Sequence, residues 1–344
     1  MCGNYGFQTN QINGQSIKTR VLTDALVEIL GVTNVRVLDS AFLLKSPIRF
    51  FLEARNGFKE CSQVIMMPGT RGLHLFLPLF VLWKQQFDRS LKYVVIGGWL
   101  PDLLERNGWL RHLCTLIDGV YVETATMAKR LVELKLPNVV ILPNFRKFTS
   151  NLKINFTPIK SPIKLVFYSR VIKEKGIEDA ISAVLCLNAE CTANPRVVLD
   201  VYGPLSDSYQ SKFQSILNKS NNVSYRGVLE PLSAYEVLQK YDLMIFPSYY
   251  EGEGFPGALL DAYIAGLPVI ASDWKYNSEI IEEGRTGFLF KVHAVEEIVA
   301  QVNMFIENPS AILQMRQHCI KKAQNYHVEN VVEKLLVGAE RLTL

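Results

Sequence analysis

Residues 246–279 read FPSYYEGEGFPGALLDAYIAGLPVIASDWKYNSE, and this stretch decides the fold class of the chain. The apolar run that leads into it, Leu243–Phe246, predicts a buried strand. Periodic apolar residues over 258–265 predict a helix, which Gly266 and Pro268 end. A second apolar run follows and predicts the next buried strand. A strand, a helix and a strand in this order indicate the parallel sheet of an α/β protein.

The loop within this stretch has the composition of a ligand-binding loop. It carries Glu251 and Glu253 together with several glycines. Glycine lets a backbone approach a ligand closely, and the helix that follows offers unpaired N–H groups and the positive end of its dipole. Open α/β sheets bind their ligands at the carboxyl ends of the strands. We therefore expect this loop to hold a ligand.

The length and composition of the chain indicate a globular protein of two domains. Its 344 residues exceed one ordinary core, and 49% of them are hydrophobic and 20% charged. The longest apolar run, 73–83, is shorter than the roughly 20 residues of a membrane span, and the first residues lack the features of a signal peptide. The 6 cysteines are scattered without metal-site spacing. This pattern favours inert thiols in a reducing compartment, and we expect a cytoplasmic protein.

The charge of the chain is uneven. Residues 1–150 contain 18 Lys and Arg against 11 Asp and Glu, or +7, whereas the remainder contains 19 against 22, or −3. A basic first half is typical of a surface that attracts anionic lipid or a phosphate-bearing acceptor, although an ordinary solvated surface explains it equally well. No basic and aromatic cluster points to nucleic acid.

Strands and helices alternate along the chain, which predicts two doubly wound, Rossmann-like α/β domains facing across a cleft. We assign residues 1–150 to the first domain, 151–162 to a linker and 163–325 to the second domain. The first strand is expected to be a stub, with the recorded start inside it, because only Met1 and Cys2 precede a polar loop. The expected strands lie at 35–38, 63–66, 93–96, 119–122 and 139–142, and then at 164–168, 196–202, 222–225, 242–246, 268–271 and 288–290.

Two cations follow the first expected strand of the second domain. Arg170 stands two residues after this strand, and Lys175 stands where the next helix opens. Arg offers a planar fork of donors and Lys a point charge, which together suit two phosphates. Ordinary surface charges explain the same residues when they are considered alone. The pair gains weight because the acidic loop would lie nearby in the same sheet.

Two carboxylates within residues 246–279 suit the hydroxyl groups of a sugar. Glu253 lies in the loop, and Asp261 lies eight residues later in the first turns of the helix. Carboxylates accept strongly from hydroxyl donors, so two at different depths could hold a ribose and a second sugar. The alternatives are solvated loop charges and the usual preference for acids in the first turn of a helix. The glycines beside Glu253 favour the sugar.

Residues 248–281 resemble the donor-binding signature of the family 4 retaining glycosyltransferases, which have the GT-B fold. That signature pairs a Glu in an E-G-F-G/P run with an acid eight residues later, here Glu253 and Asp261; the family usually has Glu at the second place. The resemblance extends over about residues 163–291 and includes Arg170 and Lys175. The first domain resembles the family more loosely. Its residues 13–19 and 97–100 are similar to those of members that build bacterial capsules and other surface polysaccharides.

The resemblance implies a role for each matched residue. Arg170 and Lys175 would neutralise the diphosphate leaving group, while Asp261 would bind the ribose and Glu253 the donor sugar. Arg170, Lys175 and Glu253 are therefore the candidate catalytic residues. It also implies that the last helix, within 326–344, returns to the first domain. Further donor-binding candidates are Gly203, Gly227, Val228, Gly254, Phe255, Pro256, Gly257 and Ala258. Acceptor-binding candidates are Gly14, Gln15, Lys18, Thr19, Gly98 and Trp99.

By this resemblance we expect a retaining hexosyltransferase that moves a sugar from a nucleoside-diphosphate sugar, UDP- rather than GDP-, to a saccharide or lipid-linked acceptor in surface polysaccharide synthesis. No cofactor or metal is expected, since the chain has no D-x-D triplet and two cations with a helix end can stabilise the leaving group. A sugar-nucleotide epimerase or a phosphorylase of the same fold would need further catalytic acids or a cofactor lysine. A catalytically silent partner subunit that binds nucleotide-sugar is the alternative from another class.

The remaining motifs favour structural roles. The 5 histidines form no metal-binding pair. The run from Gly252 to Gly257 matches G-x-G-x-x-G, but it does not follow a strand directly, which argues against a nicotinamide or flavin site. The apolar segment 75–83, followed by Lys84 and Arg89, is expected to be a core helix, with peripheral membrane contact at the cytoplasmic face as the alternative.

Overall fold

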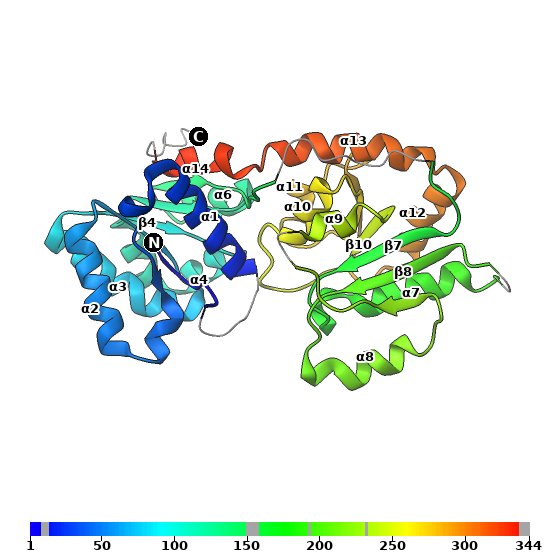
Figure 1. Cartoon of the computed structure of the whole chain (residues 1–344), viewed down its shortest axis with the longest axis horizontal. Helices are drawn as coiled ribbons and strands as arrows, with labels where there is room; N and C mark the ends of the chain where they lie inside the picture. The colour runs from blue at the N-terminus through cyan, green and yellow to red at the C-terminus, as the bar shows by residue number, and fades with distance from the viewer. Residues whose placement is uncertain (8–13, 149–157, 192–193, 231–232, 337–344) are drawn as a thin grey trace. The chain divides into compact units, whose positions relative to one another are not determined.

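The computed structural model describes residues 1–7, 14–148, 158–191, 194–230 and 233–336. The chain divides into two compact units (Figure 1). Unit 1 comprises Met1–Lys147, Gly252–Pro256 and Tyr326–Leu344, and unit 2 comprises Phe148–Glu251 and Gly257–Asn325. Each unit is a parallel six-stranded sheet with helices packed on it, which confirms the expected two-domain α/β class.

The sheet of unit 1 has the order β2-β1-β3-β4-β5-β6, and every pair of neighbours is parallel. The order reverses at β1, which lies between β2 and β3. Parallel strands need crossover connections, and the helices of unit 1 supply them. The strands are β1 (Cys2–Gly3), β2 (Leu38–Asp39), β3 (Gln63–Met67), β4 (Ser90–Val94), β5 (Gly119–Val122) and β6 (Val139–Ile141).

The helices of unit 1 pack on this sheet, and the last of them lies beside the first (Figure 1). Val331 and Val332 of α14 share one buried core with Leu22 and Leu26 of α1. The C-terminal helix therefore belongs to the core of unit 1. The helices are α1 (Gly14–Leu30), α2 (Pro47–Glu60), α3 (Thr70–Phe87), α4 (Leu100–Arg106), α5 (Gly108–Thr115), α6 (Ala125–Glu133) and α14 (Val328–Leu336), with 3₁₀ helices η1 (Val32–Asn34) and η2 (Ser40–Leu44).

Two strands of unit 1 lie away from their expected positions. The structure has β2 at Leu38–Asp39 instead of 35–38, and its length is limited because its partner β1 offers only two residues. β4 begins at Ser90 instead of residue 93 and contains the buried Lys92, which interrupts the apolar pattern. The ammonium of Lys92 donates to the carbonyl of Leu335 near the end of α14, and burial lowers its pKa.

The sheet of unit 2 has the order β12-β11-β10-β7-β8-β9, again with parallel neighbours throughout. The chain builds β7, β8 and β9 in one direction and then returns to add β10 on the other side of β7. This places a reversal of strand order between β7 and β10. The strands are β7 (Ile163–Tyr168), β8 (Val197–Tyr202), β9 (Val223–Tyr225), β10 (Leu243–Phe246), β11 (Val269–Ser272) and β12 (Gly287–Phe290).

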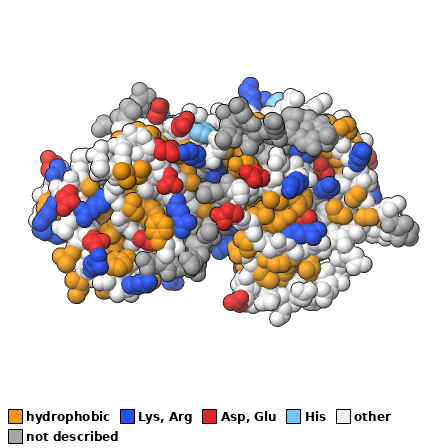
Figure 2. All heavy atoms as spheres, in the orientation of Figure 1, with side chains coloured by type: hydrophobic (Ala, Val, Ile, Leu, Met, Phe, Trp, Pro, Cys, Tyr) orange, Lys and Arg blue, Asp and Glu red, His pale blue; other side chains and the backbone are white. Residues whose placement is uncertain are grey.

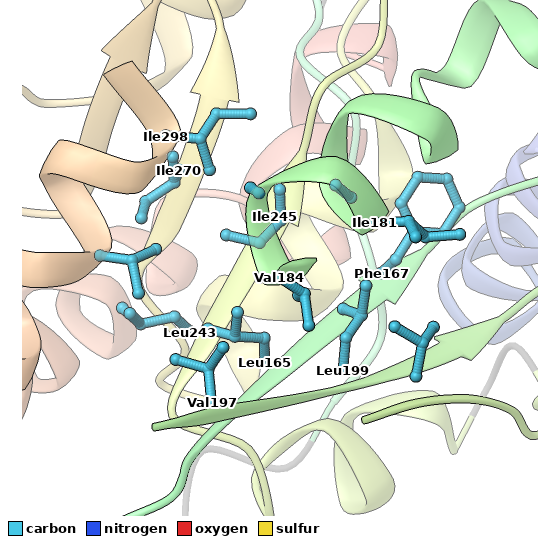
Figure 3. Packing of buried hydrophobic residues seen from close by; sticks show 14 of the residues in the cluster. Leu165, Phe167, Ile181, Val184, Val197, Leu199, Leu243, Ile245, Ile270 and Ile298 are labelled. Carbon is cyan, nitrogen blue, oxygen red and sulfur yellow. The ribbon is translucent and has the colours of Figure 1, made fainter. Parts of the chain in front are cut away.

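Apolar side chains from both the strands and the helices of unit 2 fill one core (Figure 3). Leu165 of β7 faces Leu243 of β10 in the sheet register, and Val184 and Ile298 pack against this layer from α7 and α12. Burying each such side chain contributes about 1.5–3 kcal/mol. The helices are α7 (Ile177–Asn188), α8 (Gln210–Leu217), α9 (Ala234–Leu238), α10 (Gly257–Ile264), α11 (Asn277–Ile280), α12 (Val295–Glu307) and α13 (Ser310–Gln324), with 3₁₀ helices η3 (Lys173–Lys175) and η4 (Asp207–Tyr209).

Over the ranges that the structure describes, no helix combines the length and the apolar character that crossing a membrane would require.

Candidate active site

The reversal of strand order in unit 2 brings the carboxyl ends of β7 and β10 next to each other. In open parallel sheets this is the position where ligands bind. Arg170 and η3 follow β7, whereas Tyr249 and Tyr250 follow β10. Their placement results directly from the order in which the chain adds its strands.

Two cations meet at one aromatic ring in this position. The Arg170 guanidinium lies 4.9 Å from the centre of the Tyr250 ring, and the Lys175 ammonium lies 4.9 Å from the same centre. Lys175 is buried, with 7% of its surface exposed, whereas Arg170 is exposed. The face of an aromatic ring attracts cations. Tyr250 therefore brings the two predicted phosphate-binding residues together without neutralising either charge.

Close backbone packing beside Arg170 explains one glycine of the predicted site. Gly203 follows β8 with a φ of 141°, and a Cβ there would lie 1.8 Å from the carbonyl oxygen of Ser169. Only a residue without a side chain fits. Gly227, after β9, also has a positive φ of 83°, but a Cβ there would meet nothing within 4 Å. Val228 beside it is exposed.

Asp261 lies on α10, which begins at Gly257 and continues through Ala258. The helix is buried along nearly its whole length, and only 3% of the Asp261 surface is exposed. Its second turn supplies the carboxylate, and its first turn supplies backbone N–H groups. Asp261 lies beyond the first turn of α10, so the preference for acids in a first turn does not account for it, and its binding role stays a prediction.

Tyr249, which follows β10, contacts Glu174 and His293. Its N–H donates to the carbonyl of Glu174 over 2.9 Å, and its ring packs edge-on against His293 with centres 4.5 Å apart. Burial, followed by the negative charges of Glu174, Asp179 and Glu178, raises the pKa of the Tyr249 hydroxyl. Tyr249 therefore stays a neutral phenol that can donate a hydrogen bond.

The segment that carries Glu253 belongs to unit 1, although its flanks belong to unit 2. Glu253 and Phe255 are buried, and the Phe255 ring packs edge-on against Tyr326 with centres 4.9 Å apart. The N–H of Phe255 donates to a carboxylate oxygen of Glu123 over 2.9 Å. Its carbonyl accepts from the side-chain amide of Asn144 over 2.9 Å. The four predicted donor-binding positions 253–256 therefore lie at the carboxyl ends of β5 and β6.

The predicted acceptor-binding residues of unit 1 lie on α1 and after β4. The side-chain amide of Gln15 donates to the carbonyl of Met67 over 3.1 Å, and the Thr19 hydroxyl donates to the Gln15 carbonyl over 2.9 Å. The Trp99 indole N–H donates to the carbonyl of Ile96 over 2.8 Å. Gly14 is exposed at the start of α1.

Lys18 and Gly98 contact partners inside unit 1. The Lys18 ammonium forms a buried ion pair with Glu123 at 2.6 Å. The N–H of Gly98 donates to the carbonyl of Gly252 over 3.3 Å. These two predicted acceptor residues thus lie with the Glu253 segment, whereas Arg170 and Lys175 form their own group in unit 2.

Three residues of these groups were not expected from the sequence: Glu123, Asn144 and Tyr250. Each follows a strand end, so the rule that singled out Arg170 also applies to them. The signal for Glu123 was an acid directly after the apolar strand β5, and that for Tyr250 was an aromatic residue before an acidic loop. Among the described residues, no three His, Cys, Asp or Glu side chains gather in a way that could hold a metal ion.

The family model described as glycosyl transferases group 1 matches residues 150–326, which is just over half of the chain. The match covers the described parts of β7 through α13. It therefore includes Arg170, Lys175 and residues 246–279.

Two curated relatives match the chain over different lengths. The UDP-N-acetylglucosamine–peptide N-acetylglucosaminyltransferase GtfA subunit of Streptococcus gordonii is 27% identical over 182 residues, covering 50% of this chain and 34% of that protein. The N,N'-diacetylbacillosaminyl-diphospho-undecaprenol alpha-1,3-N-acetylgalactosaminyltransferase of Campylobacter jejuni is 26% identical over 261 residues, covering 76% and 63%. The chain spans about half or less of the length of the first curated relatives that it matches.

The sucrose-phosphate synthase structure from Thermosynechococcus elongatus matches nearly the whole chain. Its TM-score is 0.73 at 14% identity, with 98% of this chain and 96% of that chain covered. The likeness confirms the expected GT-B fold of two α/β units.

Proposed function

Because the chain belongs to the glycosyl transferases of group 1, we propose that it transfers a sugar from a nucleoside-diphosphate sugar to a saccharide or lipid-linked acceptor, with retention of anomeric configuration. One observation carries the proposal: Arg170 and Lys175 share the Tyr250 ring at the strand reversal of unit 2. Two cations at one point suit the diphosphate of such a donor better than they suit a ligand with a single negative charge.

The chemistry assigned to each residue follows from its charge and burial. Arg170 and Lys175 stabilise the charge that develops on the departing diphosphate, and the backbone N–H groups at the start of α10 add to this stabilisation. The buried Asp261 carboxylate accepts from the ribose hydroxyls, and Glu253 accepts from those of the donor sugar. The two cations and the start of α10 would thus stabilise the leaving group without a metal ion, and the two carboxylates would position the sugars.

The donor and acceptor classes rest on the relatives. The Streptococcus gordonii relative is named for UDP-N-acetylglucosamine, which supports a UDP-sugar as the donor. The name of the Campylobacter jejuni relative includes a diphospho-undecaprenol, which supports a lipid-linked acceptor. We propose in addition that the protein acts in surface polysaccharide synthesis at the cytoplasmic face of a membrane.

The first test combines a donor screen with two variants. Purified protein is incubated with UDP-, GDP- and ADP-sugars, and release of the nucleoside diphosphate is measured. We expect turnover with UDP-sugars, a loss of about 10²–10³-fold in Arg170→Ala, the size observed when one electrostatic donor is removed from an active site, and a loss of about 10²-fold in Glu253→Ala, which removes a group that positions the donor sugar.

Glu251→Ala is the matched control for Glu253→Ala. Glu251 stands in the same loop, is exposed, and pairs with Lys275 at the surface, so its removal should leave turnover unchanged. Unchanged turnover in both Glu253→Ala and Arg170→Ala would contradict the site assignment. Binding of UDP-sugar without turnover of any donor would favour a silent binding subunit instead.

We further propose that α2 and the turn before it contact the membrane that carries the acceptor. Leu44, Ile48 and Leu52 recur at every fourth position and are 88%, 77% and 59% exposed. Residues 44–60 contain four basic and two acidic residues, or +2. Hydrophobic, basic and acidic side chains are interspersed over the part of unit 1 where α2 lies (Figures 1 and 2). Such a face suits an anionic lipid surface.

Ile48→Asp combined with Leu52→Asp is expected to abolish most binding to vesicles containing anionic lipid, because it replaces two inserted side chains by charges of the same sign as the lipid. Co-sedimentation with vesicles measures the effect. Met304→Asp, at an exposed position of α12 in unit 2, is the control and should bind as the wild type does. Equal sedimentation of the double variant and the wild type would rule this surface out.

A further inference from the structure

We infer that Glu123 is a positioning residue for the Glu253 segment, and this inference rests on the proposed function. Glu123 directly follows β5 and is buried, with 3% of its surface exposed. It contacts the backbone of the segment within unit 1 and would act on the donor sugar only through Glu253.

Both carboxylate oxygens of Glu123 have partners. Oε1 accepts from the Lys18 ammonium over 2.6 Å. Oε2 accepts from the N–H of Phe255 over 2.9 Å and from the N–H of Gly97 over 3.3 Å. The Lys18 ammonium also donates to the carbonyl of Val95 over 3.3 Å. One oxygen thus balances a buried charge, while the other holds the loop.

The backbone is fixed on both sides of Glu253. On one side the carbonyl of Gly252 accepts from the N–H of Gly98 over 3.3 Å. On the other side Phe255 uses its N–H on Glu123 and its carbonyl on Asn144. Glu253 therefore sits between anchored neighbours, which fixes the point of the backbone from which its side chain extends.

The glycine after Glu253 is explained by the same carboxylate. A Cβ at Gly254 would lie 2.2 Å from Oε2 of Glu123 and 2.8 Å from the carbonyl carbon of Gly97. The segment can approach Glu123 this closely only because residue 254 has no side chain. Close packing against Glu123, more than a hundred positions earlier, thus explains the glycine in the E-G-F run.

A purely structural interpretation of the Lys18–Glu123 ion pair is that Glu123 only neutralises the buried lysine. The two readings differ in what the second oxygen does. If Glu123 positions the loop, activity should follow the presence of an acceptor atom at position 123, whether or not the charge pair remains. A misplacement of about 1 Å in such a group costs about 10²-fold in rate.

Two double variants separate these readings. Lys18→Met with Glu123→Gln and Lys18→Met with Glu123→Met both remove the charge pair, but only the glutamine keeps an oxygen for Phe255 and Gly97. Because Lys18 is replaced in the same way in both, we expect kcat of the methionine variant to lie about 10²-fold below that of the glutamine variant. UDP affinity, which depends on Arg170 and Lys175, should be equal in the two.

Gly254→Ala displaces the same segment while Lys18 and Glu123 are both retained in the sequence, should the methionine variant fail to fold. It is expected to lower kcat by a similar factor with unchanged UDP affinity. If the glutamine and methionine variants have equal kcat, or if Gly254→Ala behaves as the wild type, the inference is overturned.

Hydrogen exchange of the ligand-free protein makes the test independent of the proposed function. The Phe255 amide should exchange slowly in the wild type and the glutamine variant, and faster in the methionine variant. Should the wild type transfer no sugar, the proposed function fails while this comparison still decides whether Glu123 holds the segment. Equal exchange in both variants would show that it does not.

Discussion

Lys175→Met is expected to lower the rate of sugar transfer by about 10²–10³-fold while the protein remains folded. The ammonium lies 4.9 Å from the centre of the Tyr250 ring, and the side chain is buried. A cation in a site shielded from water acts on a developing diphosphate charge far more strongly than one at the surface. Methionine fills the volume of the lysine stem without its charge. Single-turnover transfer from a UDP-sugar measures the loss.

Lys173→Met is the matched control, because Lys173 stands at the other end of the same 3₁₀ helix η3 and is exposed. It should change turnover by less than about threefold, since exposed charges are screened. Equal losses in the two variants would show that the effect arises from net charge or from η3 itself. No loss in Lys175→Met would exclude the buried ammonium from the reaction.

Gly203→Ala is expected to destabilise the protein by about 3 kcal/mol or more. The new methyl group would lie 1.8 Å from the carbonyl oxygen of Ser169, which is backbone and cannot rotate away, and a φ of 141° is unfavourable for alanine. Relief requires Ser169 to shift, and Arg170 follows it directly. The variant should therefore lose both stability, measured by denaturant unfolding, and UDP affinity, measured by calorimetry.

Gly227→Ala separates the strain of a positive φ from the steric clash. Gly227 has a φ of 83°, but its added Cβ would meet nothing within 4 Å. Only the conformational cost of about 1–2 kcal/mol is expected, with little change in UDP affinity. If the two alanine variants were equally stable, contact with Ser169 would not be the reason for glycine at 203.

The sequence carried most of the information about unit 2. β10 and β11 are short runs buried at every position, and the other strands of unit 2 keep apolar residues at most positions, so the hydrophobic pattern located them. β10 and β7 were placed to within one residue of their observed starts. The cations after β7 could be predicted for the same reason, since a strand end in a parallel sheet marks its binding edge.

Unit 1 was harder to predict because its strands are shorter and contain exceptions. Lys92 lies buried inside β4, whereas a lysine in the sequence normally indicates an exposed position. Its stabilising partner, the Leu335 carbonyl, is far away in the sequence. The contact of Glu123 with Phe255 is equally non-local, and no spacing rule encodes it. Lys18 was predicted as an acceptor-binding residue, and the sequence contained no sign of its ion pair.

The division of the chain has a consequence for the order in which the protein can fold during synthesis. Unit 1 contains residues 1–147, but its core also includes Val331 and Val332 of α14, which leave the ribosome after all of unit 2. Domains generally fold as units in the order of synthesis. Unit 2, although second in the sequence, is complete first. The nascent N-terminal half must wait, with an apolar surface on α1 still uncovered, until the last helix emerges.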